Sequence, residues 1–440
     1  MQPLASLYAS HLQTLCARTD EALSATGFEA LAIHAGRAPM LFLDDQPYPF
    51  KVNPHFKAWV PLLDAADCWI VYQPGKQPRL VFLQPVDYWH KPPAIPSDYW
   101  TDKFSIDVIR EPAQAKACMA QLPRCAFIGE AQPEFSDWGF EAMNHAQLLE
   151  RLHYPRAIKT PYELQCMRFA SDRGVRGHQA AEAAFRSGDS EYAIHMAFVQ
   201  ATGLTEAALP YSNIVALNEN AAVLHYQHQE TTAPAQRHSF LIDAGGQFAG
   251  YASDITRTYA HAHDDFEALV EGMHRLQLRL CAQVRAGVDY ADIHLNAHRE
   301  IAALLRDSGV IKISADDAVA SGLSGVFFPH GVGHLLGLQV HDVSGFSISP
   351  EGRHKARPAG HPNLRLTRTL QPGFVVTIEP GLYFIDALLE TARQSAHAAQ
   401  IDWRRVEYFR PYGGIRIEDN VACTAGAPEN LTRDAMARLS

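Results

Sequence analysis

The sequence lacks the features that mark membrane-spanning, exported and nucleic-acid-binding chains. No segment of its 440 residues reaches the ~18 consecutive apolar residues that a transmembrane helix needs. The N-terminus has no basic stretch followed by an apolar core, so we expect no export signal. The formal net charge is −10, and no basic stripe is present that could neutralise a phosphate backbone. We therefore expect neither a membrane nor a nucleic acid as a partner.

Closely spaced cysteine pairs are also missing. The sequence has seven cysteines, an odd number, and none of them form a CxxC pair. They are Cys16, Cys68, Cys118, Cys125, Cys166, Cys281 and Cys423. Scattered cysteines of this kind are typical of reduced, mostly buried thiols. We expect a cytoplasmic protein.

The first third of the chain predicts an α/β domain. Apolar residues at helical spacing between positions 4 and 15 predict an amphipathic first helix. Short apolar runs follow at 30–34, 68–72 and 80–82, separated by Gly, Pro and Asp. The sequence Thr160-Pro161-Tyr162-Glu163 is a capping box with proline at the first helical position, which predicts that a new helix starts there. We predict one domain over residues 1–158 and a second over 159–440.

The second domain combines long helices with strand pairs. We predict helices around 160–185, 190–203, 264–285 and 291–307, and strands at 239–243, 250–259, 374–379 and 414–421. Residues 344–372 are rich in Gly, Pro, Arg and His and lack periodicity, which predicts a long loop. Loops of this length are uncommon unless they serve a site.

Two aspartates flank a glycine-containing turn within residues 240–258. If this hairpin is symmetric about residues 247–250, Asp243 lies opposite Asp254, with their Cβ atoms roughly 5 Å apart on one face. At an effective dielectric of about 20, two such charges ~4 Å apart repel by roughly 4 kcal/mol. The pattern predicts a cation between them. The alternative is that one aspartate serves the turn and the pairing is accidental.

Two glutamates and a histidine cluster complete a candidate ligand set. Glu379 and Glu418 each end an apolar strand pattern, where charge is disfavoured unless it is paired. Three histidines, at 330, 334 and 341, lie in a glycine-rich segment between the aspartates and Glu379. This segment lacks the Glu that a zincin helix carries between its histidines. Any single one of the 22 histidines is more often structural than functional. We therefore assign no role to His261, His263, His294 and His298.

Four carboxylates and one imidazole make a mostly hard-oxygen ligand set, which favours Mn, Co or Mg over a thiolate zinc site. The candidate ligands are Asp243, Asp254, His334, Glu379 and Glu418. Four anions balance two divalent cations, and ions about 3.5 to 4 Å apart can bridge a hydroxide nucleophile. The residues alone thus predict hydrolysis of a polarised carbonyl or phosphoryl group.

The ordered segments DAG, DITRT, HGVGH, TIEPG and GIRIED resemble those of the pita-bread metallopeptidases, which include methionine aminopeptidase, aminopeptidase P and prolidase. The resemblance implies an α+β, creatinase/aminopeptidase-like catalytic domain. It implies the same five ligands, with Asp254 and Glu418 bridging two ions, Asp243 binding mainly one, and His334 and Glu379 the other. We expect two divalent ions per subunit, and Mn²⁺ is the first candidate for their identity.

Segments 42–51 and 85–90 resemble the bacterial Xaa-Pro dipeptidases, the PepQ-type prolidases, whose subfamily includes organophosphorus acid anhydrolases. The resemblance implies hydrolysis of dipeptides with C-terminal proline, a side activity on organophosphate triesters, and a homodimer. Two alternatives stay open. One is an aminopeptidase P acting on longer Xaa-Pro peptides, and the other is a non-catalytic pita-bread protein that serves as a binding module.

The resemblance also implies roles around the ions. By position, His225 and His341 resemble the family's transition-state histidines, and His330 a further active-site histidine. Imidazole N–H groups can stabilise the charge of a tetrahedral intermediate, and Glu379 could carry a proton to the leaving proline nitrogen. Arg365 resembles the family's carboxylate-binding arginine; the alternative is a solvated loop charge.

The remaining candidates are substrate contacts and supports. Arg416 lies two residues before Glu418, so we expect it to support the metal carboxylates. Tyr211 and Tyr290 are candidate pocket residues, with a core or surface tyrosine as the alternative. Trp89 and Asp45 lie in the N-terminal domain, which relatives use to close the partner subunit's active site in a dimer. The resemblance implies that this closure limits the substrate to two residues.

Overall fold

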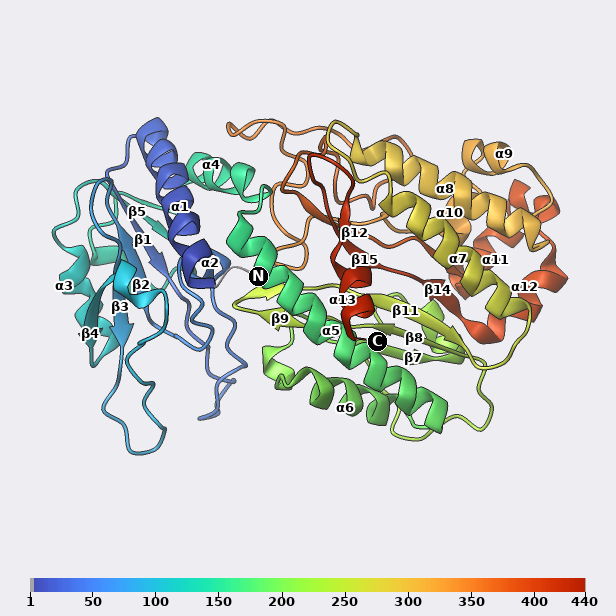
Figure 1. Cartoon of the computed structure of the whole chain (residues 1–440), viewed down its shortest axis with the longest axis horizontal. Helices are drawn as coiled ribbons and strands as arrows, with labels where there is room; N and C mark the ends of the chain where they lie inside the picture. The colour runs from blue at the N-terminus through green and yellow to red at the C-terminus, as the bar shows by residue number, and fades with distance from the viewer. Residues whose placement is uncertain (1–3, 440) are drawn as a thin grey trace. The chain divides into compact units, whose positions relative to one another are not determined.

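The computed structural model describes residues 4–439 and divides into two compact units (Figure 1). The first comprises the described residues up to Cys166 together with Ala249–Tyr251 and Ile348–Arg353. The second comprises Met167–Phe248, Ala252–Ser347 and the described residues from His354 onward. In the described part of the chain, no helix has the length and apolar character required to cross a membrane.

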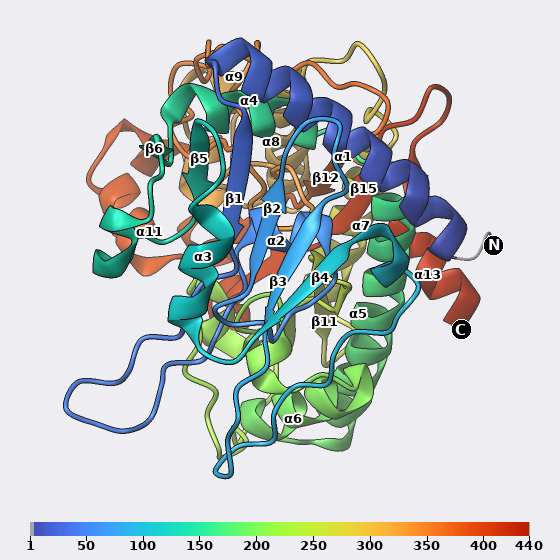
Figure 2. The same ribbon diagram turned by 90° about the vertical axis from the view of Figure 1, so that its left-hand side faces the viewer.

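A six-stranded sheet forms the centre of the first unit, in the order β4-β3-β2-β1-β5-β6 (Figure 2). Its elements are α1 (Leu4–Thr26), β1 (Ala30–His34), α2 (Pro54–Trp59), β2 (Trp69–Tyr72), β3 (Arg79–Leu83), β4 (Ser105–Ile109), α3 (Ala115–Met119), β5 (Cys125–Ile128), β6 (Ala142–Met143) and α4 (Ala146–Arg156). The sheet is mixed, because β2 runs antiparallel to both neighbours whereas β4, β5 and β6 pair in parallel. Strands β1 and β2 are buried throughout, which explains their continuous apolar runs. The predicted α/β domain is confirmed.

The predicted capping box is present at the start of α5. The Thr160 backbone N–H donates to Glu163 Oε2 at 2.8 Å, and the Glu163 N–H donates to Thr160 Oγ1 at 3.4 Å. These reciprocal bonds satisfy two amides that the helix itself leaves without partners. The helix then runs for 27 residues.

Helices and short strands alternate in the rest of the chain. The helices are α5 (Pro161–Ser187), α6 (Glu191–Thr202), α7 (Asp265–Cys281), α8 (Tyr290–Asp307), α9 (Ala315–Ala320), α10 (Ser324–Phe327), α11 (Asp386–Arg393), α12 (Trp403–Phe409) and α13 (Leu431–Leu439). The strands are β7 (Ile214–Leu217), β8 (Ser239–Asp243), β9 (Gln247–Phe248), β10 (Tyr251–Ala252), β11 (Thr256–Ala260), β12 (Val375–Ile378), β13 (Gly381–Tyr383), β14 (Gly414–Arg416), β15 (Asp419–Ala422) and β16 (Glu429–Asn430). Short 3-10 helices lie at Thr101–Lys103, Pro112–Gln114, Pro133–Asp137, Glu206–Ala208, Asn218–Ala222, Ala396–Gln400 and Arg410–Tyr412.

Three small antiparallel sheets build the strand layer of the second unit, in the orders β11-β8-β7, β12-β15-β16 and β13-β14. Single bridges between Thr256 and Glu418 and between Leu335 and Val376 connect these sheets and the loop before residue 344. Helix α6 packs against β7, and α7 packs against β11. The sheets thereby hold residues from distant parts of the sequence next to one another.

The predicted long helices and the strand 239–243 are confirmed. Two predicted strands, at 250–259 and 414–421, are each divided in two. The second divides because β14 pairs with β13, whereas β15 pairs with β12, so the chain changes partner at Ile417 and Glu418. Residues 344–372 contain no helix or strand, as predicted.

Candidate metal centre

Asp243 ends β8, and Asp254 lies two residues before β11, but the predicted register is wrong. Asp243 pairs with Thr256, not with Asp254. The turn is centred one residue later than expected, because Ala249 and Gly250 both adopt positive φ, of 51° and 86°, as a two-residue hairpin turn requires. Since side chains alternate with a period of two, Asp254 still shares a face with Thr256 and therefore with Asp243.

A tyrosine and an arginine hold these aspartates in place. The Tyr211 hydroxyl lies 2.8 Å from Asp243 Oδ1 and 2.5 Å from Asp254 Oδ1. Arg416 Nη2 donates to Asp243 Oδ2 at 2.7 Å, and its Nη1 donates to the Tyr383 hydroxyl at 2.8 Å. Arg416 is 4% exposed. These contacts fit the support role expected from its place on the strand, and Arg416 also lines the cavity described below.

The interruption between β14 and β15 directs Glu418 toward the aspartates. The Glu418 N–H donates to the Thr256 carbonyl at 3.0 Å, and Thr256 Oγ1 donates to Glu418 Oε2 at 2.6 Å. The Asn420 side chain accepts from the Asp254 N–H at 3.0 Å and donates to the Asp254 carbonyl. Asp254 and Glu418 are therefore fixed by side chains from each other's strands.

His334 and Glu379 come from the glycine-rich segment and from the end of β12. Nδ1 of His334 lies 3.0 Å from the Leu335 carbonyl, and its Nε2 lies 3.4 Å from Asp254 Oδ2 and 3.5 Å from Glu379 Oε1. When Nδ1 donates to the carbonyl, Nε2 of the neutral ring is an acceptor. An acceptor that faces two carboxylate oxygens needs a proton or a metal cation between them.

The five side chains fit divalent ions. Donor atoms of Asp254, His334 and Glu418 all lie within 4.8 Å of one another. Ligand atoms about 2.1 Å from a shared ion lie roughly 3 Å apart, close to the distances measured around His334. Burial raises the pKa of Glu379 to about 7 and raises the pKa values of Glu418 and Asp243. Buried carboxylates of this kind stay ionised together only when cations neutralise them.

A cavity of about 410 Å³ opens onto this centre. It is lined by all five candidate ligands and by the three predicted catalytic histidines, His225, His330 and His341. The ring of His341 lies edge-to-face with that of His334, with centroids 4.3 Å apart, and His330 Nε2 lies 2.9 Å from the Tyr383 hydroxyl. Arg365 also lines the cavity, at an exposed position of the long loop.

Four predicted substrate contacts are not among the residues that line the cavity. Tyr290 is fully buried and donates to the Thr377 carbonyl at 2.7 Å, so the expectation that it lines the pocket is wrong. It is a core residue because the start of α8 packs under the strand that carries Glu379. Trp89 and Asp45 lie in exposed segments of the first unit. Tyr211 contacts the aspartates directly but does not line the cavity.

The sequence analysis missed several residues of the site. Arg357 and Asn363 line the cavity beside Arg365, and Arg357 packs on the Phe346 ring with its guanidinium carbon 4.3 Å from the centroid. The sequence did offer a signal for Arg357, because it lies in the same long loop as Arg365. Thr256 and Asn420 carry no such signal, because their roles depend on which strands become neighbours.

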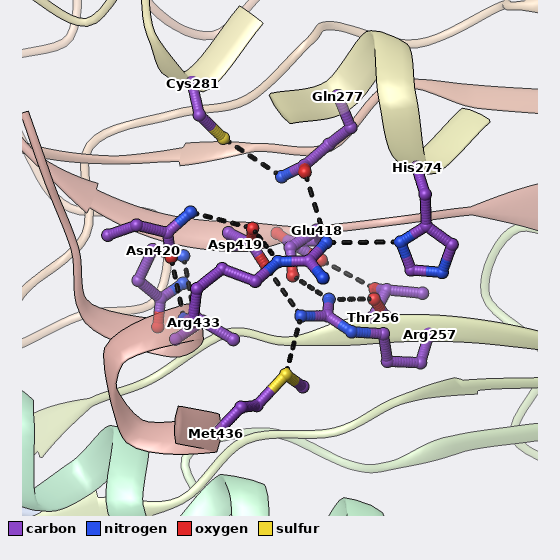
Figure 3. A network of polar contacts seen from close by, with 12 residues as sticks. Thr256, Arg257, His274, Gln277, Cys281, Glu418, Asp419, Asn420, Arg433 and Met436 are labelled. Atoms are coloured by element: carbon purple, nitrogen blue, oxygen red, sulfur yellow. Dashed lines mark hydrogen bonds and ion pairs between the residues drawn. The ribbon is translucent and has the colours of Figure 1, made fainter. Parts of the chain in front are cut away.

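A buried ionic network lies behind the carboxylates (Figure 3). Asp419 is fully buried, and it accepts from Arg257 Nη2 at 2.6 Å and from Arg433 Nε at 2.8 Å. Burial alone would raise the pKa of Asp419, but the two guanidinium groups hold it below its usual range. Arg257 also donates to the Glu418 carbonyl at 2.7 Å. The network therefore fixes the backbone that carries Glu418.

Known proteins match the chain over nearly its whole length. A family model described as the N-terminal domain of Xaa-Pro dipeptidase matches residues 6–154, and one described as metallopeptidase family M24 matches residues 165–425. A Xaa-Pro dipeptidase of Xanthomonas axonopodis pv. citri is 53% identical over 99% of this chain and 98% of its own length. One from Stenotrophomonas maltophilia is 52% identical over 98% of both chains.

Solved structures agree on the fold. Zinc-substituted aminopeptidase P of E. coli in complex with product superposes with a TM-score of 0.73 and 21% identity, covering 98% of this chain and 95% of that chain. Aminopeptidase PepP of Pseudomonas aeruginosa gives 0.71 and 22%, with the same coverage. The predicted fold class, an α/β domain followed by a pita-bread domain, is confirmed. With the catalytic-domain model matched over residues 165–425 and a relative that shares 53% of its residues, the chain belongs to metallopeptidase family M24.

Proposed function

We propose that this protein is a Xaa-Pro dipeptidase, which hydrolyses dipeptides with C-terminal proline. The observation that carries the proposal is the convergence of four carboxylates, two buried and two partly buried, and His334 in one cavity, in a chain 53% identical to a protein named Xaa-Pro dipeptidase. The proposed ligands are Asp243, Asp254, His334, Glu379 and Glu418. Two divalent ions held there, Mn²⁺ in our proposal, would activate water and polarise the scissile carbonyl.

The protein's own groups then bind the substrate and move protons. His225, His330 and His341 surround the cavity, where an imidazole N–H can donate to the oxygen that becomes negative in the transition state. Glu379 carries a proton to the proline nitrogen, which must be protonated before it leaves.

Recognition of proline uses its carboxylate, because a Xaa-Pro bond has no amide N–H to bind. Arg365 is the proposed partner, since a guanidinium can bind a carboxylate through two parallel hydrogen bonds. It lines the cavity together with Arg357.

The first unit is proposed to limit substrate length. We propose that the chain works as a homodimer in which residues 1–158, including Trp89 and Asp45, restrict the site to two residues, while residues 159–440 carry the chemistry. Trp89 is 78% exposed, with its ring 4.9 Å from that of Tyr88, and such exposure supports a contact with a partner subunit. We also propose a cytoplasmic location, since all seven cysteines are free thiols.

A length series tests the dipeptidase activity against the aminopeptidase P alternative. The Mn²⁺-loaded protein is expected to cleave Ala-Pro and to leave Ala-Pro-Ala nearly untouched. Equal rates on both peptides would favour an aminopeptidase P. Fewer than two ions per chain after Mn²⁺ loading, with no hydrolysis of either peptide, would favour a non-catalytic binding protein.

We also propose a side activity on organophosphate triesters. Two ions among carboxylates can polarise a phosphoryl oxygen as well as a carbonyl oxygen. The test is hydrolysis of a p-nitrophenyl phosphotriester, measured by the release of nitrophenol. The control variant Asp254→Asn should lack this activity.

A further inference from the structure

Three histidines form a second group of metal-ligating side chains in the catalytic domain. They are His294 and His298 of α8 and His361 of the long loop. Each offers a ring nitrogen, and the three nitrogens lie within 4.8 Å of one another. None of the three lines the cavity at the carboxylate centre. Residues four apart on a helix share a face, which explains how α8 supplies two of them.

The ring geometry is close to that of three imidazoles on one ion. Ring centroids lie 4.7 Å apart for His294 and His298, 4.7 Å for His294 and His361, and 4.6 Å for His298 and His361. Three imidazoles on a tetrahedral zinc have centroids roughly 5 Å apart and ligand nitrogens about 3.3 Å apart. The measured distance between His294 Nε2 and His361 Nδ1 is 2.9 Å. A small outward shift of the rings would admit an ion.

The hydrogen bonds of the three rings are compatible with replacing a ring proton by a metal ion. His298 Nδ1 lies 2.9 Å from Ser324 Oγ, and when it donates there its Nε2 keeps a free lone pair. His294 Nδ1 accepts from the Val332 N–H at 3.3 Å, so its proton sits on Nε2, directed at His361. An ion bound at Nε2 would move this proton to Nδ1. Because Nδ1–H would then face the Val332 N–H, the His294 ring must turn away from that donor, and one long hydrogen bond is exchanged for metal–nitrogen bonds.

The surroundings keep the imidazoles neutral, as metal ligands must be. His294 is 1% exposed and His298 3%. Burial, together with the neighbouring histidines, lowers the pKa of His294 to about 2 and that of His298 to about 3. The ring of Phe328 packs against both of them. An uncharged set of three nitrogens suits Zn²⁺, Ni²⁺ or Cu²⁺, whereas the carboxylate centre suits harder ions such as Mn²⁺.

We propose that His294, His298 and His361 form a third metal site, for an ion of the zinc type, separate from the carboxylate centre. The ion would tie the long loop to α8. His361 is followed directly by Pro362 and Asn363, which line the cavity. Loading of this site would therefore fix the part of the loop that carries Arg365.

Zinc stoichiometry of the whole protein tests the proposal. Metal-free protein is loaded with Zn²⁺, desalted and analysed for bound metal. We expect three zinc ions per chain for the wild type and two for His361→Ala, whose side chain is only partly buried. His263→Ala, which removes a histidine with a 94% exposed side chain, should keep three. Asp254→Asn should keep the histidine-bound ion while losing zinc from the carboxylate centre, which separates this proposal from the proposed function.

Chemical protection of the wild-type protein gives a second readout that needs no variant. In the wild type, Zn²⁺ should protect His361 from modification by diethyl pyrocarbonate, as mapped by mass spectrometry, while His263 stays reactive. Equal zinc content of the wild type and His361→Ala, or no protection of His361 at saturating Zn²⁺, would overturn the proposal.

Discussion

The Tyr211 hydroxyl lies between Asp243 and Asp254, 2.8 Å from one carboxylate and 2.5 Å from the other. A phenol has one proton to donate, so the two like charges share a single donor from a loop outside their ladder. Burial, reinforced by the two aspartates, raises the pKa of Tyr211 well above its usual value, so the donor stays protonated. Tyr211 is thus placed to orient both carboxylates of the proposed metal centre.

Removal of this hydroxyl should weaken metal binding. Tyr211→Phe is expected to lower the Mn²⁺ affinity by about 10-fold, the lower end of what loss of a ligand-orienting partner usually costs. Isothermal titration with Mn²⁺ measures it. Tyr226→Phe is the matched control, since its hydroxyl donates to the remote carboxylate of Glu191 at 2.8 Å. Equal affinities of the two variants would show that Tyr211 does not orient the aspartates.

The buried ion network behind Glu418 predicts a stability effect. Asp419→Asn leaves two guanidinium groups without their shared anion, and breaking a buried pair from one side costs about 3 kcal/mol or more. Thermal unfolding of the catalytic domain should shift to clearly lower temperature. Asp434→Asn removes the same charge at an exposed position of α13 and should unfold close to wild type. An Asp419→Asn protein with wild-type stability would contradict the assigned role.

A buried histidine predicts a pH dependence of stability. His178 is 1% exposed, its Nε2 lies 2.9 Å from the Ala244 carbonyl, and burial lowers its pKa to about 4. Because the unfolded chain has a histidine pKa of about 6.5, the unfolded state binds more protons between these values. The stabilisation is therefore fully present above pH 6.5 and falls by about 3 kcal/mol as the pH drops to 4.

The variant His178→Gln isolates that contribution, because its amide can still donate to the Ala244 carbonyl. The difference in Tm between wild type and variant should move in favour of the variant as the pH falls from 7 to 5. A pH-independent difference would mean that His178 does not titrate on unfolding.

Arg365 predicts a specific loss of substrate recognition. Arg365→Met should lower kcat/KM for Ala-Pro roughly 10- to 100-fold, as expected for loss of a charge-assisted hydrogen bond. Arg353→Met, in the same long loop but outside the cavity lining, is the control. With alanyl-prolinamide, which lacks the carboxylate, wild type and Arg365→Met should have similar rates. A variant that loses activity equally on both substrates would not support carboxylate binding.

The sequence predicted the proposed ligands better than it predicted their arrangement. Glu379 and Glu418 stand out because a charge at the end of a buried strand needs a partner, and no tertiary information is required to see it. The register of Asp243 was wrong because it depends on the backbone of the Ala249–Gly250 turn, which the residue pattern did not define.

Supporting residues could not be predicted for a related reason. Asn420 clamps the Asp254 backbone from 166 positions away, and Tyr211 reaches Asp243 from 32. Neither residue type is unusual where it occurs in the sequence. Tyr290 was predicted as a pocket residue and is a core residue. A tyrosine at the start of a helix fits either position, and the hydrogen bond from its hydroxyl to the Thr377 carbonyl of β12 holds it in the core.

The central claim is that the cavity holds a dinuclear centre in which Asp254 binds both ions. The most direct test is the rate of Ala-Pro hydrolysis with Mn²⁺ by wild type and by Asp254→Asn, which keeps the shape of the side chain and removes its charge. The account predicts a fall of at least about 1000-fold in the variant, since a ligand shared by both ions cannot be replaced locally. Hydrolysis by Asp254→Asn at the wild-type rate would contradict it.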